Sequence, residues 1–302
     1  MTDSLEALRN RMDGANDLRA VVRTMKAMSA SNITQYEHAV QALERYFATV
    51  EQGLIACLKQ TDVMHSFAQN RKVDCEATNC GATNCGVTII VFGSDQGLVG
   101  QFNDSLAEFV VEKLGQIKGQ KNIWVVGDRI HGRLQDANLT LEKCFNVPSS
   151  VEWITPLIGD LLLATEHKWA SNIHSPLYLF HQRPGKISGQ YKAVMNQFLP
   201  LDSSWQLSLQ NQPWLGPSLP QTLGTTELTL SALVREYLFV SIYQACAESL
   251  ASENASRLIA MQRAEKNIEE MLASLQQKYH HQRQETIDAE LFDVVAGYMS
   301  DD

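Results

Sequence analysis

Residues 93–103, which read GSDQGLVGQFN, are the strongest candidate in this sequence for a phosphate-binding turn. The stretch is rich in glycine and stands between a predicted strand and a predicted helix. However, its glycines follow the spacing G-x-x-x-G-x-x-G rather than G-x-G-x-x-G, and no Gly-Lys-Ser/Thr follows to hold phosphate and magnesium. A tight strand-to-helix turn, with Asp95 bonding local backbone amides, explains the stretch better. We predict no ligand here.

Cysteines and histidines are the other side chains that could bind a metal. Cys75, Cys80 and Cys85 recur in CEATNCGATNC, whereas tetrahedral zinc sites use pairs roughly two to four residues apart and a fourth ligand. We interpret this stretch as a loop insertion with incidental cysteines, and a metal or redox site is the alternative. His280 and His281 would point about 100° apart on a helix, which indicates a solvated patch.

The remaining polar side chains do not form a catalytic pattern. The other histidines are scattered, and spacing alone places no Ser/His/Asp group and no pair of carboxylates together. We therefore expect no active site, no cofactor and no metal in this chain.

The overall charge excludes some classes of partner. The chain has 302 residues and a formal net charge of −9, whereas nucleic acids and anionic membrane surfaces attract a basic face. No apolar run reaches the roughly 18 residues of a membrane-spanning helix, and the N-terminus MTDSLEALRNRMDG resembles neither a signal peptide nor a transit peptide. We expect no nucleic acid partner, no membrane insertion, and cysteines that are mostly reduced.

Proline placement divides the chain. All eight prolines lie between Pro148 and Pro220, so both ends can form long helices and the middle cannot. Apolar residues recur at steps of three and four in both ends, which is the pattern of a coiled coil. The first stripe comprises Leu5, Leu8, Met12, Ala15, Leu18, Val22, Met25, Ser29, Ile33, Tyr36, Val40, Leu43, Phe47, Val50 and Leu54. The last comprises Leu258, Met261, Ile268, Leu272, Leu275, Tyr279, Ile287, Leu291 and Val294.

These helices must pack against each other. A helix from about residue 228 to 299 would be roughly 105 Å long, which is too long for a compact domain. Each large apolar side chain buried along a stripe contributes about 1.5–3 kcal/mol, and the only matching stripe is the N-terminal one. We predict a long antiparallel coiled coil of the two terminal helices, with the middle of the chain folded at its base.

The middle alternates between strand and helix patterns. We predict strands at 87–93, 122–127, 176–182 and 191–200, and helices at 103–117, 129–137 and 152–171. This alternation is typical of an open, largely parallel, Rossmann-like α/β sheet. The expected domains are an N-terminal shaft helix at 1–60, a central α/β domain at 61–226 and a C-terminal shaft helix at 227–302.

Four motifs of the sequence carry a resemblance to one known family. Residues 8–33 (LRNRMDGANDLRAVVRTMKAMSASNI) and 94–103 (SDQGLVGQFN) are similar to the opening helix and to the S-T-D-R-G-L-C-G-x-x-N turn of the gamma subunit of F-type ATP synthases. Residues 243–267 (YQACAESLASENASRLIAMQRAEKN) and 283–298 (RQETIDAELFDVVAGY) are similar to its C-terminal helix motifs. The motifs occur in the family's order, and the part from about residue 139 to 226 matches by architecture only.

The resemblance implies a mechanical subunit. In that family the terminal helices form a rotor shaft inside a ring of alpha and beta subunits, and the α/β domain lies near the epsilon subunit and the c ring. Proton or sodium flow turns the shaft, which presents a different face to each beta subunit and so changes the nucleotide affinities. The resemblance implies one copy per complex, peripheral to the cytoplasmic face of a bacterial inner membrane.

Five positions match the family's subunit contacts. Shaft contacts to the beta subunits fall on Met25, Arg257, Arg283 and Gln284, and Glu290 matches a further glutamate of the terminal motif. Ordinary solvation of a helix face is the alternative for the polar positions, and packing within the stripe is the alternative for Met25. Departures from the family's pattern, such as aspartate at 288 and TQYEH at 34–38, suggest a divergent branch, such as an alternative F-type ATPase.

A function from another class stays open. The chain could be an α/β ligand-binding or enzymatic domain that carries a helical hairpin for oligomerisation. This alternative predicts self-association through the apolar stripe and measurable ligand affinity at 93–103.

Overall fold

The computed structural model describes residues 4–60, 86–117, 119–171, 176–185, 190–199, 214 and 225–300. They fall into two units, one made of 1–30 with 257–302 and the other of 31–256, and each is described by itself. Cys75, Cys80 and Cys85 lie outside the described residues.

A long helix lies at each end of the described chain. Helix α1 spans Leu5–Gln60 and helix α7 spans Thr226–Ser300. Neither contains a proline, so no residue lacks the N–H that continues the helical hydrogen bonds. This confirms the two terminal helices predicted from the sequence.

Five strands in the described residues of the second unit form one open sheet. They are β1 Val87–Phe92, β2 Lys121–Val126, β3 Leu141–Phe145, β4 Leu177–Pro184 and β5 Tyr191–Leu199. Their order is β3-β2-β1-β4-β5, with β1 to β4 parallel and β5 antiparallel to β4. The predicted largely parallel sheet is confirmed. The sequence prediction missed β3, an edge strand whose middle residues are exposed.

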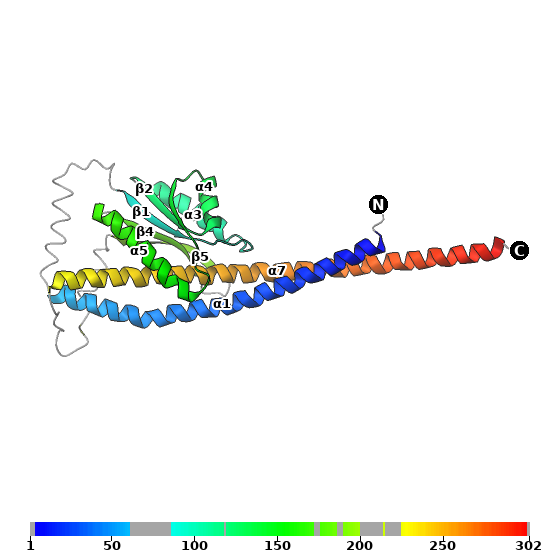
Figure 1. The fold of residues 1–302 in the computed structure, drawn as a ribbon, viewed down its shortest axis with the longest axis horizontal. Coiled ribbons are helices and arrows are strands. Elements are labelled where there is room, and N and C mark those ends of the chain that lie inside the picture. Colours follow the sequence, from blue (N-terminus) through cyan, green and yellow to red (C-terminus); the bar gives the residue numbers. More distant parts are fainter. Residues whose placement is uncertain are drawn as a thin grey trace. The chain divides into compact units, whose positions relative to one another are not determined.

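Helices cover both faces of this sheet (Figure 1). Helices α3, Phe102–Gln116, and α4, Asp128–Asp136, pack on one face. Helix α5, Ile154–Ser171, follows the short turn η1, Val151–Trp153, and packs on the other face with parts of α1 and α7. Alternate residues of β1 therefore belong to two cores: Ile89 and Val91 face α3, whereas Ile90 and Phe92 face α5 and α7.

The two long helices run antiparallel in both units. In the second unit, the Tyr46 hydroxyl donates to Glu236 at 2.8 Å, and the Asn32 amide, earlier in α1, reaches Asn254, later in α7. In the first unit, Arg23 pairs with Glu265 at 2.7 Å. Nearer the chain start, Leu8 lines a small hollow with four residues of α7, which are Lys278, His281, Gln282 and Glu285.

Burial along α1 follows a seven-residue step. Leu8, Ala15, Ser29 and Tyr36 are buried at this interval, with Val22 half-buried between them. This is the spacing of a coiled coil and confirms the predicted seam.

Four residues of the predicted stripes do not pack. Leu18 is 60% exposed. The next residue, Arg19, is half-buried, so the seam of α1 passes through position 19 rather than position 18. Ile287, Leu291 and Val294 of α7 are also exposed. The first described residues of α1 meet α7 near Glu285, so no described segment of α1 pairs with the part of α7 that follows.

Candidate functional site

The turn after β1 is held by hydrogen bonds to two neighbouring strand ends. Asp95 accepts the N–H of Asp128, which follows β2, and the N–H of Val147, which follows β3, both at 2.9 Å. The prediction that Asp95 bonds local amides was therefore wrong in one respect. Its partners are distant in sequence, because the carboxyl ends of parallel strands meet at one edge of the sheet.

A second set of bonds closes the turn on the first residues of α3. The Ser94 N–H donates to the Asn103 carbonyl oxygen Oδ1 at 3.2 Å, and the Asn103 amide donates to the Ser94 hydroxyl at 2.8 Å. Both side chains are buried. The polar side chains of Ser94 and Asn103 thus bond within the turn.

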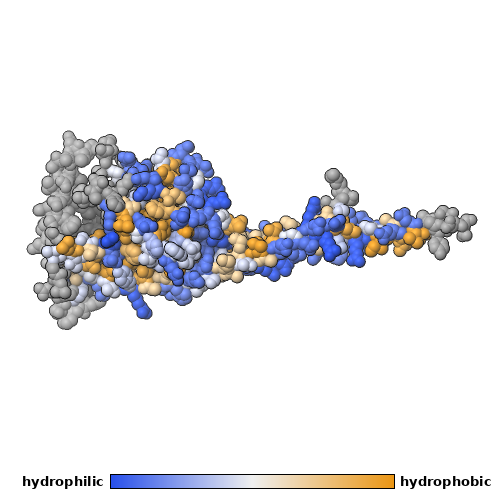
Figure 2. Space-filling view, viewed as in Figure 1, coloured by the Kyte–Doolittle hydropathy of each residue, from blue (hydrophilic) through white to orange (hydrophobic). Residues whose placement is uncertain are grey.

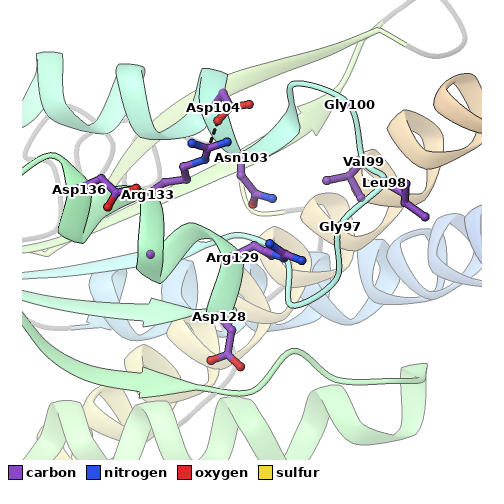
Figure 3. A pocket seen from close by; sticks show the side chains of 11 residues that line it. Gly97, Leu98, Val99, Gly100, Asn103, Asp104, Asp128, Arg129, Arg133 and Asp136 are labelled. Atoms are coloured by element: carbon purple, nitrogen blue, oxygen red, sulfur yellow. Dashed lines mark ion pairs between the residues drawn. The ribbon is translucent and has the colours of Figure 1, made fainter.

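A hollow of about 660 Å³ opens beside this turn, between the first residues of α3 and one side of α4 (Figure 3). Arg133 pairs with Asp104 at 2.8 Å across it, and Arg129 lies over the turn near Gly97. Its charged lining residues are three aspartates and two arginines: Asp104, Asp128, Asp136, Arg129 and Arg133. A lining with more acidic than basic groups does not favour a nucleotide phosphate.

Helix α7 occupies the place where open α/β sheets bind ligands. Such sheets bind ligands beyond the carboxyl ends of the strands, where the strand order reverses, and here the order reverses between β1 and β4. The hydroxyl of Ser249 donates to the carbonyl of Phe92, the last residue of β1, at 3.2 Å. The hydroxyl of Ser252 lies 3.1 Å from the carbonyl of Gln182 on β4. The usual ligand crevice is therefore filled by a helix of the same chain.

Ser256 extends this contact to the turn after β1. Its hydroxyl donates to the carbonyl of Val99 at 2.5 Å. Gly100 follows with φ +56°, and a Cβ on this glycine would lie 3.5 Å from the Ser256 hydroxyl. We call the four residues Glu248, Ser249, Ser252 and Ser256 the seat of α7, because they lie on one face of the helix at steps of three and four.

Glu248 is the charged member of the seat. One carboxylate oxygen, Oε2, accepts from Arg183 Nε at 2.8 Å and lies 2.9 Å from His181 Nε2. The other oxygen accepts from the Gln244 amide at 2.9 Å. Glu248 is 8% exposed and His181 is fully buried, whereas the Arg183 side chain is 48% exposed.

These contacts keep Glu248 ionised. Burial favours the neutral acid, but the hydrogen bonds from His181 and Arg183 outweigh it and lower the pKa of Glu248 to about 2. Burial lowers the pKa of His181, which is the larger effect, and Glu248 opposes it only in part. His181 is therefore neutral at pH 7 and donates its Nε2–H to the carboxylate.

The five predicted contact residues are spread over both long helices. Met25 is half-buried on α1, between Arg23 and Lys26, which both pair with Glu265. Arg257 of α7 is buried, with 9% exposure. Arg283, Gln284 and Glu290 are exposed on α7. These positions do not form one cluster in the described chain.

The sequence analysis did not identify the seat of α7. Its residues stand in AESLASENASR, where small hydroxyl side chains recur at helical spacing. That spacing does not by itself separate buried from exposed serines, because a helical serine hydroxyl can also donate to its own helix, as Ser252 does to the carbonyl of Glu248 at 2.8 Å.

Neither a membrane span nor a metal cluster was found in the residues that the structure describes. None of the described helices has a window long and apolar enough to cross a bilayer. No described group of three or more His, Cys, Asp or Glu side chains is arranged to hold a metal ion.

Comparison with known proteins gives one consistent family. A family model described as ATP synthase matches residues 4–300. The chain is 25% identical to an ATP synthase gamma chain of Anaeromyxobacter sp. (strain K), over 97% of this chain and 98% of the relative. It is 24% identical to the ATP synthase gamma chain of Fusobacterium nucleatum, with the same coverage.

Solved structures share the fold. The rotor of the Euglena gracilis mitochondrial ATP synthase superposes with a TM-score of 0.59 at 14% identity, covering 94% of this chain and 98% of that one. The central stalk of the Tetrahymena thermophila mitochondrial ATP synthase gives a TM-score of 0.53 at 18% identity, covering 81% and 99%. With the family match over nearly the whole length, the chain belongs to the ATP synthase family, and its relatives there are gamma chains.

Proposed function

We propose that this chain is the central-stalk rotor, or gamma subunit, of an F-type ATP synthase, and that it couples proton or sodium movement through the membrane sector to ATP synthesis or hydrolysis. The observation that carries the proposal is the seat of α7 in the sheet crevice. A rotor must transmit torque between its base and its shaft. An α/β sheet that holds a long helix where other sheets bind a ligand is suited to that task.

The proposal includes the partners. The shaft is held in a ring of alpha and beta subunits, the α/β domain contacts the epsilon subunit and the c ring, and each complex contains one copy. The complex lies on the cytoplasmic face of a bacterial inner membrane. The bacterial gamma-chain relatives support this, and so does the c ring named with the Tetrahymena central stalk.

The exposed end of α7 supports a contact with the ring. Figure 2 shows hydrophobic surface close to the C-terminal end of this helix. Five large apolar side chains there are between 44% and 72% exposed: Ile287, Leu291, Phe292, Val294 and Val295. Exposed apolar side chains on adjacent turns are typical of a surface that a partner covers.

We further propose that Arg283, Gln284 and Glu290 contact beta subunits, since all three are exposed on this part of α7. Met25 and Arg257 are proposed to contribute from the helix pair, where they are half-buried and buried. The division into a shaft helix at 1–60, an α/β domain at 61–226 and a second shaft helix at 227–302 is part of the same proposal. The divergence from the family's motifs suggests an alternative F-type ATPase.

Co-expression with the alpha and beta subunits of the same organism tests the function. The chain should co-elute at one copy per ring and show no nucleotide turnover when purified alone. Incorporation at as many copies as there are beta subunits would contradict a rotor. Self-association in sedimentation at two concentrations, together with nucleotide affinity in calorimetry, would instead favour the α/β domain with an oligomerisation hairpin.

A further inference from the structure

The contacts of Glu248 differ in kind from those of the three serines in the seat. Ser249, Ser252 and Ser256 each place one neutral hydroxyl on a backbone carbonyl. Glu248 instead places a buried charge on two side chains of one strand, His181 and Arg183. Hydrogen bonds to an ionised acceptor are roughly twice as strong as neutral ones.

The direction of these bonds limits rotation of the helix. His181 and Arg183 are two residues apart, so both project from the same face of β4 and both reach Oε2 of Glu248. A rotation of α7 by one residue, about 100°, would move Glu248 off both partners. The serine hydroxyls, in contrast, turn freely about one bond and find a carbonyl over a wider range of helix orientations.

The described residues of β4 and β5 include no acidic side chain that could compete with this carboxylate. On β4 the charged group is Arg183, and on β5 the residue opposite Arg183 is Lys192. On α7 itself, Gln244 donates to the other oxygen of Glu248. Glu248 thus accepts three N–H donors, two of them at Oε2 and one at Oε1.

We propose that Glu248 is the positioning residue that fixes the rotational angle of α7 on the sheet, and that torque passes between the α/β domain and the shaft through its contacts with His181 and Arg183. The second half of this inference rests on the proposed rotor function. Neutralising Glu248 should let α7 turn in its seat, so that ATP hydrolysis in the ring continues but drives less ion movement.

Glu248→Gln tests the proposal, and Glu166→Gln is its matched control. Glu166 pairs with Arg235 at 2.9 Å, and so also joins α7 to the α/β domain, but the two side chains are 41% and 58% exposed. Hydrogen exchange of the full-length chain measures how often the seat of α7 opens, and it requires no partner subunit. The amides of residues 244–256 should exchange roughly one hundred-fold faster in Glu248→Gln than in the wild type. In Glu166→Gln they should stay within about two-fold.

Measurements on the complete ATP synthase test whether torque passes through the contacts of Glu248. In vesicles, the ratio of ion pumping to ATP hydrolysis should fall by about five-fold or more in Glu248→Gln, which is the low end of an ordinary coupling between sites. This ratio should be unchanged in Glu166→Gln. A merely structural defect would lower assembly and both activities together, and would leave the ratio intact. An unchanged ratio in an assembled Glu248→Gln complex overturns the proposal.

Two further outcomes also have a defined interpretation. If Glu248→Gln does not assemble, Arg183→Gln replaces it, because Arg183 is itself half-exposed and Glu248 keeps its bonds from His181 and Gln244. A normal ratio in Arg183→Gln overturns the proposal. If the wild-type complex itself does not pump, the rotor function fails. The positional role of Glu248 is then judged on hydrogen exchange alone, where equal rates in Glu248→Gln and the wild type overturn it.

Discussion

Neutralising Glu248 should also remove a defined part of the pH dependence of stability. Glutamine has the shape of the protonated acid and cannot ionise, so Glu248→Gln compares the charged and neutral forms of one side chain. The wild-type carboxylate accepts bonds from His181 and Arg183 while it is 8% exposed. We expect the charged form to stabilise the folded chain.

The magnitude follows from the pKa. The folded pKa of Glu248 is about 2, against an ordinary value of 4.5. At about 1.4 kcal/mol per pH unit, this difference corresponds to roughly 3 kcal/mol. The folded pKa is the lower one, so the stabilisation is fully present above pH 4.5 and is lost as the pH falls toward 2.

Urea unfolding at a series of pH values measures this difference. The fluorescence of Trp124, which is fully buried in the core of the α/β sheet, reports unfolding there. At pH 7 the free energy of unfolding of Glu248→Gln should be lower than that of the wild type by roughly 3 kcal/mol. This difference in the free energy of unfolding should decrease steadily as the pH falls below 4.5, the ordinary pKa of the glutamate side chain.

His181 should give a separate effect at higher pH. Its folded pKa is lowered from 6.5, so the unfolded chain binds a proton there before the folded chain does. Stability should therefore begin to fall below that pH in both proteins. If the difference in the free energy of unfolding between the wild type and Glu248→Gln stays constant from pH 7 to pH 3, the charge of Glu248 does not stabilise the folded chain as proposed.

Three more predictions concern other parts of the chain. Gly127→Ala should lower the free energy of unfolding by about 2 kcal/mol or more, because φ is +118° and a Cβ would lie 2.8 Å from the backbone of Ser94; Gly132→Ala, which meets nothing within 4 Å, should be neutral or stabilising in the same urea titration. Glu265→Gln removes the partner of Arg23 and Lys26, and should lower the melting temperature measured by circular dichroism at low salt but much less at high salt. Glu270→Gln, which pairs at 3.8 Å with the exposed Lys266, should change the melting temperature little at either salt concentration. Deleting 294–302 removes exposed apolar residues of α7 and should weaken, but not abolish, ATP-driven ion pumping in vesicles, since the rest of the shaft still transmits torque; full loss would mean that the deleted segment carries all of it.

The elements built from regular patterns could be predicted from the sequence. The absence of proline before Pro148 and after Pro220 permitted two long helices, and apolar residues at steps of three and four predicted them. Runs such as VTIIVF, which is buried along its whole length, were enough for four of the five described strands. The missed strand, LEKCF, has charged residues at its centre because it is at the sheet edge, and an isolated sequence cannot show which strand is at the edge.

The site was harder to predict than the fold. A serine or glutamate on a long helix has the same sequence signature whether it faces solvent or a strand end. The choice depends on where the carboxyl ends of β1 and β4 lie, which only the assembled sheet determines. Leu18 shows the same limit: a one-residue difference in the seam leaves it 60% exposed, although its type and spacing suggested burial.

The central claim is that this chain turns inside a ring of other subunits. A probe attached through Glu112→Cys, an exposed position on α3, would show this in a complex immobilised by its beta subunits. We predict that ATP drives the probe around in one direction, in steps set by the symmetry of the ring. A probe that stays fixed while the same complexes hydrolyse ATP would contradict it.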